Sequence, residues 1–131
     1  MNTNPLLVAG LFIFAASLQA VAAEPSAKEG RSLYHVVSLK LKSGTTPEQI
    51  KSVETAFVAL KTKIPGVTSL NWGTNVSPEH HDKGFTHCFV LTFASDKDRD
   101  AYLVHPEHKA FGAILHPVMD EVFVLDFWGK E

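Results

Sequence analysis

The fold is decided by the stretch Leu33-Tyr-His-Val-Val-Ser-Leu-Lys-Leu-Lys42, whose side chains alternate as in a β-strand with two different faces. One face carries His35, Val37, Leu39 and Leu41, and the other carries Tyr34, Val36, Ser38 and Lys40. Such a strand needs partner strands beside it and a layer of helices or sheet over its apolar face. We expect the rest of the chain to supply both.

A helix signature follows this strand. Thr46 is placed to cap the helix, Pro47 occupies its first position and Gln49 completes a capping box. Apolar side chains then recur at steps of three and four residues until the helix ends at Pro65-Gly66. The stripe consists of Ile50, Val53, Phe57, Leu60 and Ile64.

Three further strands are predicted at residues 67–76, 85–93 and 122–127. Ser95 caps a second helix, which Pro106 breaks in two with His105 near the cap of the restarted piece. The order β-α-β-β-α-β predicts an α+β fold, a ferredoxin-like sheet with helices on one face. The helix-facing side of the sheet is expected to hold Val37, Leu39, Phe89 and Leu91.

The opposite side of the sheet is also expected to be apolar, and the last strand is apolar on both faces. Side chains predicted to face water there include Tyr34, Val36, Cys88 and Val90. An apolar face of this kind needs a cover, which predicts a homodimer whose two sheets face each other as a dimeric α+β barrel. Cys88, the single cysteine, is interpreted as a small buried residue.

The N-terminal segment predicts export. Residues 1–23 carry no charge, and the apolar run from Leu6 to Ala16 leads to small residues that fit a cleavage site. We expect a signal peptide at 1–23, a flexible lead-in at 24–32 and one domain at 33–128, in the periplasm or outside the cell and off the membrane after cleavage. The alternative is an uncleaved anchor, although a spanning helix needs about 20 apolar residues.

Composition excludes several functions. The net charge is −2 and no basic stripe is present, so nucleic acid is not an expected partner. His105 and His108 have an H-x-x-H spacing without a third ligand, so no metal site is expected. No Gly-rich phosphate loop or dedicated cofactor motif occurs, and no cofactor is expected.

Polar rings should gather between sheet and helices. Strand alternation places His35 and His87 on the helix-facing side, and helical spacing turns His108 toward the sheet. An apolar pocket with a few polar groups is typical of a small-molecule site, although each histidine could equally be a core residue bonded to a backbone carbonyl. The candidate pocket comprises His35, Val37, Phe57, His87 and Phe89, with Tyr102 and His108 as the candidate catalytic pair.

Motifs along residues 33–127 resemble the stress-responsive A/B barrel (Dabb) family. They are His35-Val-Val, Ile64-Pro-Gly, Trp72-Gly-x-Asn-Val76, Lys83-Gly-Phe-Thr-His87, Val90-x-Thr-Phe93 and Tyr102-x-x-His105-Pro-x-His108-x-x-Phe111. The resemblance implies a dimeric α+β barrel and a link to stress response. It also points to a plant member that closes a polyketide ring without a cofactor, whose working tyrosine and histidine match Tyr102 and His108 and whose pocket histidines match His35 and His87.

Two functions follow. The first is an exported homodimer that holds a small apolar or aromatic ligand without turnover. The second is a cofactor-independent cyclase or lyase in which His108 takes a proton beside a carbonyl and Tyr102 holds the developing enolate oxygen. The first is favoured because the chain carries no feature unique to a reaction.

Overall fold

The computed structural model describes residues 30–130, so the predicted signal peptide and most of the predicted lead-in lie outside the described residues. The elements are β1 (Leu33–Leu41), α1 (Pro47–Lys63), β2 (Val67–Thr74), β3 (His87–Phe93), α2 (Asp96–Val104), α3 (Pro106–Leu115) and β4 (Met119–Trp128). The predicted order of strands and helices, including the broken second helix, is confirmed.

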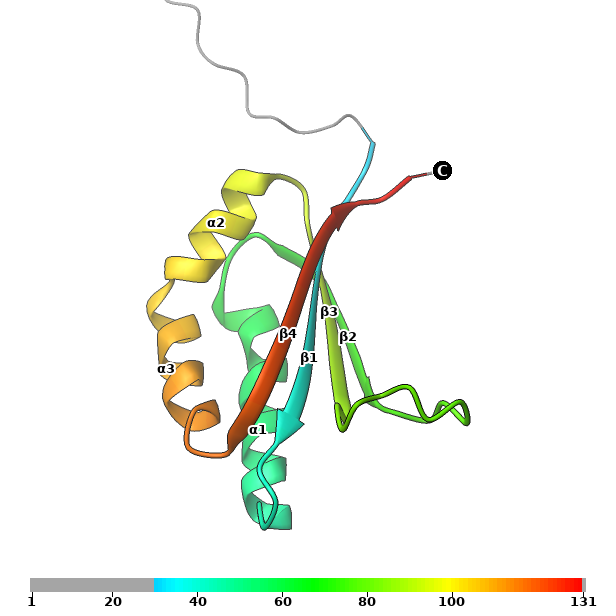
Figure 1. The fold of residues 1–131 in the computed structure, drawn as a ribbon. Coiled ribbons are helices and arrows are strands. Elements are labelled where there is room, and N and C mark those ends of the chain that lie inside the picture. Colours follow the sequence, from blue (N-terminus) through cyan, green and yellow to red (C-terminus); the bar gives the residue numbers. More distant parts are fainter. Residues whose placement is uncertain (1–29, 131) are drawn as a thin grey trace, which may run out of the picture.

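The four strands form one antiparallel sheet in the order β2-β3-β1-β4. The strand β1 lies in the interior of this sheet, and the three helices cover one face (Figure 1). This is the predicted ferredoxin-like arrangement. Within residues 30–130 no helix is long and apolar enough to cross a membrane.

Strand ends differ from the prediction. The strands β2 and β3 are shorter because residues 75–86 between them form a polar loop. The strand β4 begins earlier, at Met119, because Met119 pairs with Leu41 beyond an irregularity in the ladder after Lys40. Pairing between segments so far apart along the chain leaves no local pattern in the sequence.

The predicted capping residues form hydrogen bonds at the starts of α1 and α3. The Gln49 backbone N–H donates to Thr46 Oγ1 at 3.3 Å, and the Thr46 N–H donates to Gln49 Oε1 at 2.9 Å. His105 both ends α2 and starts α3, because its Nδ1 accepts the Glu107 N–H at 3.1 Å. The extended backbone of His105 is the conformation that a following proline favours.

The core lies between the helices and the sheet. All four side chains predicted for the helix-facing side, Val37, Leu39, Phe89 and Leu91, are buried. The ring of Phe57 from α1 stacks on Phe89 with centroids 3.8 Å apart and meets Phe111 from α3 edge-on. These aromatic contacts hold α1 and α3 at fixed positions over β3.

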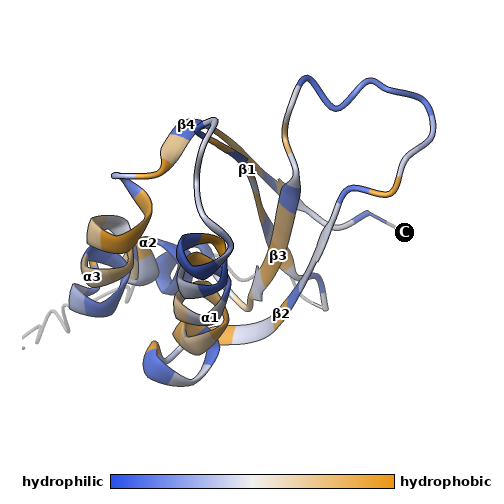
Figure 2. Cartoon of the chain, turned by 90° about the horizontal axis from the view of Figure 1, so that it is seen from below, coloured by the Kyte–Doolittle hydropathy of each residue, from blue (hydrophilic) through white to orange (hydrophobic). Residues whose placement is uncertain are grey.

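The other face of the sheet carries no helix, and the loop of residues 75–86 projects from that side (Figures 1 and 2). Cys88 lies there and is exposed, which agrees with its predicted place on this face and contradicts its interpretation as a buried residue in the single chain. We call the side chains of this face on β4 the outer patch: they are Phe123, Leu125 and Phe127, which are 51, 51 and 45% exposed. Strand β3 is largely hydrophobic in colour in Figure 2.

Candidate functional site

A cavity of about 280 Å³ opens between α3 and the half of the sheet formed by β1 and β4. Its apolar walls are Val37, Phe57, Leu103, Phe111, Leu115, Met119, Val122 and Val124. Its polar lining is His35, Tyr102, His108, His116 and Asp126, with Gly112 completing the wall on α3. The cavity is therefore mostly apolar with its polar groups drawn from several elements, the usual form of a small-molecule site.

Three rings form a row along the cavity. Tyr102 on α2 lies between His35 on β1 and His108 on α3, with centroid distances of 5.7 Å to His35 and 4.7 Å to His108. The break at Pro106 creates this arrangement, because it lets α2 and α3 present Tyr102 and His108 to the same space. Phe93 supports the row from β3, with its centroid 5.3 Å from that of Tyr102.

The surroundings set the protonation of Tyr102 and His108. Burial raises the pKa of the Tyr102 phenol well above its usual value, so the hydroxyl keeps its proton and can donate a hydrogen bond. Burial, with a smaller effect from nearby His35, lowers the pKa of His108, and a hydrogen bond with the backbone of Leu103 opposes this. A neutral imidazole thus lies beside a protonated phenol, a pairing suited to taking a proton and stabilising an oxyanion.

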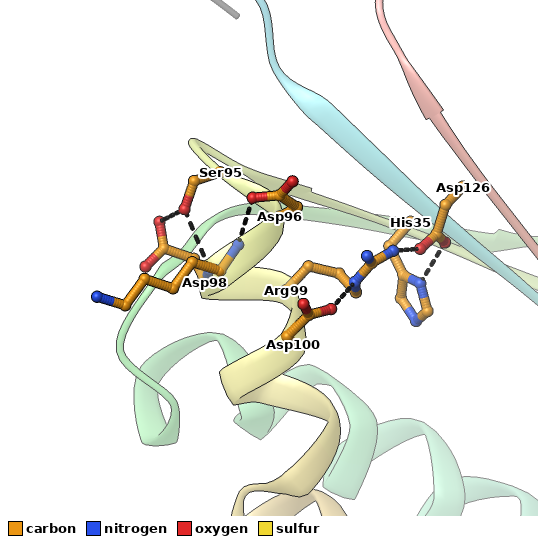
Figure 3. A network of polar contacts seen from close by, with 8 residues as sticks. His35, Ser95, Asp96, Asp98, Arg99, Asp100 and Asp126 are labelled. Carbon is orange, nitrogen blue, oxygen red and sulfur yellow. Dashed lines mark hydrogen bonds and ion pairs between the residues drawn. The ribbon is translucent and has the colours of Figure 1, made fainter. Parts of the chain in front are cut away.

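His35 has a carboxylate behind it. Its Nδ1 lies 2.6 Å from Asp126 Oδ1, and Arg99 Nη1 donates to the other oxygen, Oδ2 (Figure 3). An ionised carboxylate only accepts hydrogen bonds, so the His35 proton sits on Nδ1. In the neutral ring this leaves Nε2 as an acceptor.

Five of the seven predicted site residues meet in this cavity: His35, Val37, Phe57, Tyr102 and His108. The other two, His87 and Phe89, do not line it. His87 Nε2 donates to Glu54 Oε1 at 3.2 Å and its Nδ1 lies 2.8 Å from Thr86 Oγ1, so both ring nitrogens have partners. The structure therefore separates His87 from the cavity and joins it to α1.

Sequence reasoning missed two polar groups. Asp126 had a usable signal, because it is the charged residue inside the otherwise apolar run from Val122 to Trp128. Arg99 had none, since a charged residue on a short polar helix normally faces water. In residues 30–130 no group of three or more histidine, cysteine or acidic side chains is arranged to hold a metal ion.

Comparison with protein families gives one match that spans most of the chain. The model of the stress responsive A/B barrel domain matches residues 33–129. A stress-response A/B barrel domain-containing protein of Arabidopsis thaliana is 33% identical over 93 residues, which are 71% of this chain and 85% of the relative. Olivetolic acid cyclase of Cannabis sativa is 28% identical over 93 residues, covering 71% of this chain and 92% of the cyclase.

Solved structures agree with this match. A hydroxynitrile lyase from Passiflora edulis superposes with a TM-score of 0.71 at 26% identity, covering 76% of this chain and 94% of the lyase. A dimeric ferredoxin-like protein of Jannaschia sp. CCS1 superposes with a TM-score of 0.65 at 28% identity, covering 73% of this chain and 97% of that protein. The relatives thus include a cyclase, a lyase and a dimer.

Proposed function

The chain belongs to the stress-responsive A/B barrel domain family, and on this premise we propose that it is an exported homodimer that holds a small apolar or aromatic ligand between sheet and helices. One observation carries the proposal: the cavity of about 280 Å³, with apolar walls and polar groups along one row. Apolar walls favour the body of a ligand by excluding water, and the polar groups fix its orientation.

Gly112 offers a direct test of binding in the cavity. A Cβ built on Gly112 has no neighbour closer than 3.6 Å, and Gly112 lines the cavity, so we expect a larger side chain at this position to extend into it. Gly112→Leu should therefore fill the cavity, while Ala113→Leu, one residue along and exposed, should leave it open. Gly112→Leu raises the helix propensity at its position, and Ala113→Leu keeps it high, so both variants should retain α3.

The assay is isothermal titration with a panel of alkylbenzenes, alkylphenols and aromatic aldehydes. We expect binding to the wild type and to Ala113→Leu, and loss of binding in Gly112→Leu. Unchanged affinity in a folded Gly112→Leu protein would place the ligand elsewhere and refute the proposal.

The homodimer is supported by the outer patch. Phe123, Leu125 and Phe127 are each about half exposed in the single chain, and Tyr34 stacks on Phe127 with centroids 4.9 Å apart. A continuous apolar face of this kind is usual for a protein interface. The relatives that are dimers with the same fold support a second copy of this chain as the cover.

Export is proposed from the sequence of residues 1–23, which has the composition of a signal peptide. Expression in a host with a secretory pathway should give a mature chain that begins after the small residues near Ala23. Intact-mass measurement of the secreted protein checks this, and recovery of the full chain in the membrane fraction would favour the anchor instead.

A second function, a cofactor-independent cyclase or lyase, is favoured by the pairing of Tyr102 and His108 and by relatives named as a cyclase and a lyase. In a cyclase, neutral His108 would take a proton next to a carbonyl. In a lyase, it would take the hydroxyl proton of a cyanohydrin as the bond to the nitrile carbon breaks, and the protonated ring would pass that proton to the leaving cyanide, which gives an aldehyde and hydrogen cyanide. Tyr102 would donate a hydrogen bond to the oxygen on which charge develops. General base catalysis of this kind contributes roughly 10²–10⁴-fold.

Two substrates test this second function: a linear poly-β-ketone for cyclisation and mandelonitrile for cleavage. Turnover by the wild type that falls at least about 100-fold in both Tyr102→Phe and His108→Gln would establish it. Ligand binding with no turnover of either class would instead support the binding function.

A further inference from the structure

Arg99, Asp126 and His35 form a continuous polar chain from the surface of α2 to the cavity (Figure 3). Each Asp126 carboxylate oxygen has its own partner, since Oδ1 accepts from His35 and Oδ2 accepts from Arg99. The Arg99 guanidinium is itself held by Asp100, whose Oδ1 lies 2.7 Å from Nε. These polar contacts therefore connect three elements: α2, β4 and β1.

Asp126 needs such a restraint because of its place in the fold. It lies on β4, an edge strand of the sheet, and its side chain is 23% exposed. A carboxylate with access to water can rotate away from an imidazole at little cost, because water supplies equivalent hydrogen bonds. The guanidinium presents donors in a rigid planar fork, which fixes the orientation of the carboxylate that it binds.

The hydrogen bond to Asp126 decides which ring nitrogen of His35 carries the proton and which one can accept a hydrogen bond. With the proton held on Nδ1 by Asp126, the neutral ring has its lone pair on Nε2, which points away from Asp126 (Figure 3). His35 lines the cavity, and because Asp126 occupies Nδ1, Nε2 is the ring nitrogen left for a ligand. The side chain of His35 is only 5% exposed, and few water molecules compete for it.

We propose that Arg99 is a positioning residue that acts through Asp126 to fix His35 as a hydrogen-bond acceptor, and that the cavity consequently prefers apolar ligands that carry a hydroxyl group. The preferred ligand is an aromatic or alicyclic alcohol or phenol, whose O–H donates to His35 Nε2. An ether of the same shape lacks this donor, so it would cover Nε2 without giving the nitrogen a hydrogen bond. The ligand preference rests on the proposed binding function, whereas the positioning of His35 does not.

The first experiment reads the tautomer of His35 directly. Histidine-selective ¹⁵N labelling gives ring spectra of the seven histidines, and a His35→Gln variant assigns the signals of His35. In its neutral ring form, the wild type should show His35 protonated at Nδ1 and unprotonated at Nε2. In Arg99→Met the Nδ1–H form should decrease and the Nε2–H form should appear.

Two matched variants separate this effect from a general change of charge. Lys97→Met removes one positive charge from the same helix at an exposed position and should leave the His35 spectrum unchanged. Arg99→Lys keeps the charge without the fork and should give an intermediate spectrum. A folded Arg99→Met protein with the wild-type tautomer would overturn the positioning role, since an ion pair that only joins α2 to β4 would leave the ring unaffected.

The second experiment compares 4-propylphenol with 4-propylanisole by isothermal titration. The wild type and Lys97→Met should bind the phenol about five-fold more tightly, the equivalent of about 1 kcal/mol for one net hydrogen bond. The ratio should fall toward one in Arg99→Met. A wild type that does not discriminate, or an Arg99→Met protein that keeps the full ratio, would overturn the ligand preference. Failure of both compounds to bind the wild type would contradict the proposed function, and the ring spectra would then decide the role of Arg99 alone.

Discussion

Truncation of Phe57 should cost more stability than any change at the surface of α1. Phe57 is 1% exposed, stacks on Phe89 with centroids 3.8 Å apart and meets Phe111 at 4.7 Å. Removal of a buried phenylalanine ring costs about 3–5 kcal/mol. Two aromatic neighbours place Phe57→Ala in the upper half of that range, at about 4–5 kcal/mol. A domain of this size has a total stability of about 5–15 kcal/mol.

Urea unfolding at fixed protein concentration measures this loss, because dimerisation would make stability depend on concentration. Val58→Ala is the matched control, since Val58 follows on the same helix and is 38% exposed, and it should cost less than about 1 kcal/mol. A loss below about 2 kcal/mol in Phe57→Ala, with an unchanged urea slope, would show that the stacked rings do not hold α1 to the sheet.

Three other variants test the site, the interface and a helix cap. The pKa of His108 is lowered in the folded chain, so the unfolded chain binds more protons as pH falls through about 6.5 and the free energy of unfolding decreases over that interval. In unfolding measured from pH 8 to pH 5, His108→Gln should lose less stability than the wild type. An identical loss in the two proteins would contradict the lowered pKa. Leu125→Lys places a charge in the outer patch and should give a monomer in light scattering, whereas Val104→Lys on α2 should remain a dimer. A dimeric Leu125→Lys protein would show that the interface does not lie at the outer patch. His105→Ala should lose about 1 kcal/mol of stability in urea by removing the cap of α3, and His105→Asn should lose less; equal losses would mean that the side-chain bond to Glu107 contributes nothing.

Sequence patterns predicted the elements well because their causes are local. The capping box at Thr46 and the restart at Pro106 depend on residues within one helical turn, and both occur as predicted. The alternation along β1 correctly separated the buried face from the half-exposed face. The early start of β4 was missed because it depends on pairing of Met119 with Leu41, far away in the chain.

The candidate site was predicted in part for a similar reason. Alternation and helical spacing state which face a side chain occupies, and they correctly brought His35, Tyr102 and His108 together. They do not state where along that face a side chain lies. His87 shares the face with His35, yet it reaches Glu54 on α1 and does not line the cavity.

By itself the sequence determined the order of elements, the apolar face of each and the residue types that can exchange protons, because these follow from spacing along the chain. Only the tertiary structure decided which charged groups join His35. Asp126 and Arg99 come from β4 and α2, and their contact with His35 exists only when the edge strand and the broken helix are docked on β1. The tautomer of His35, and with it the choice between acceptor and donor in the cavity, is therefore a property of the folded chain.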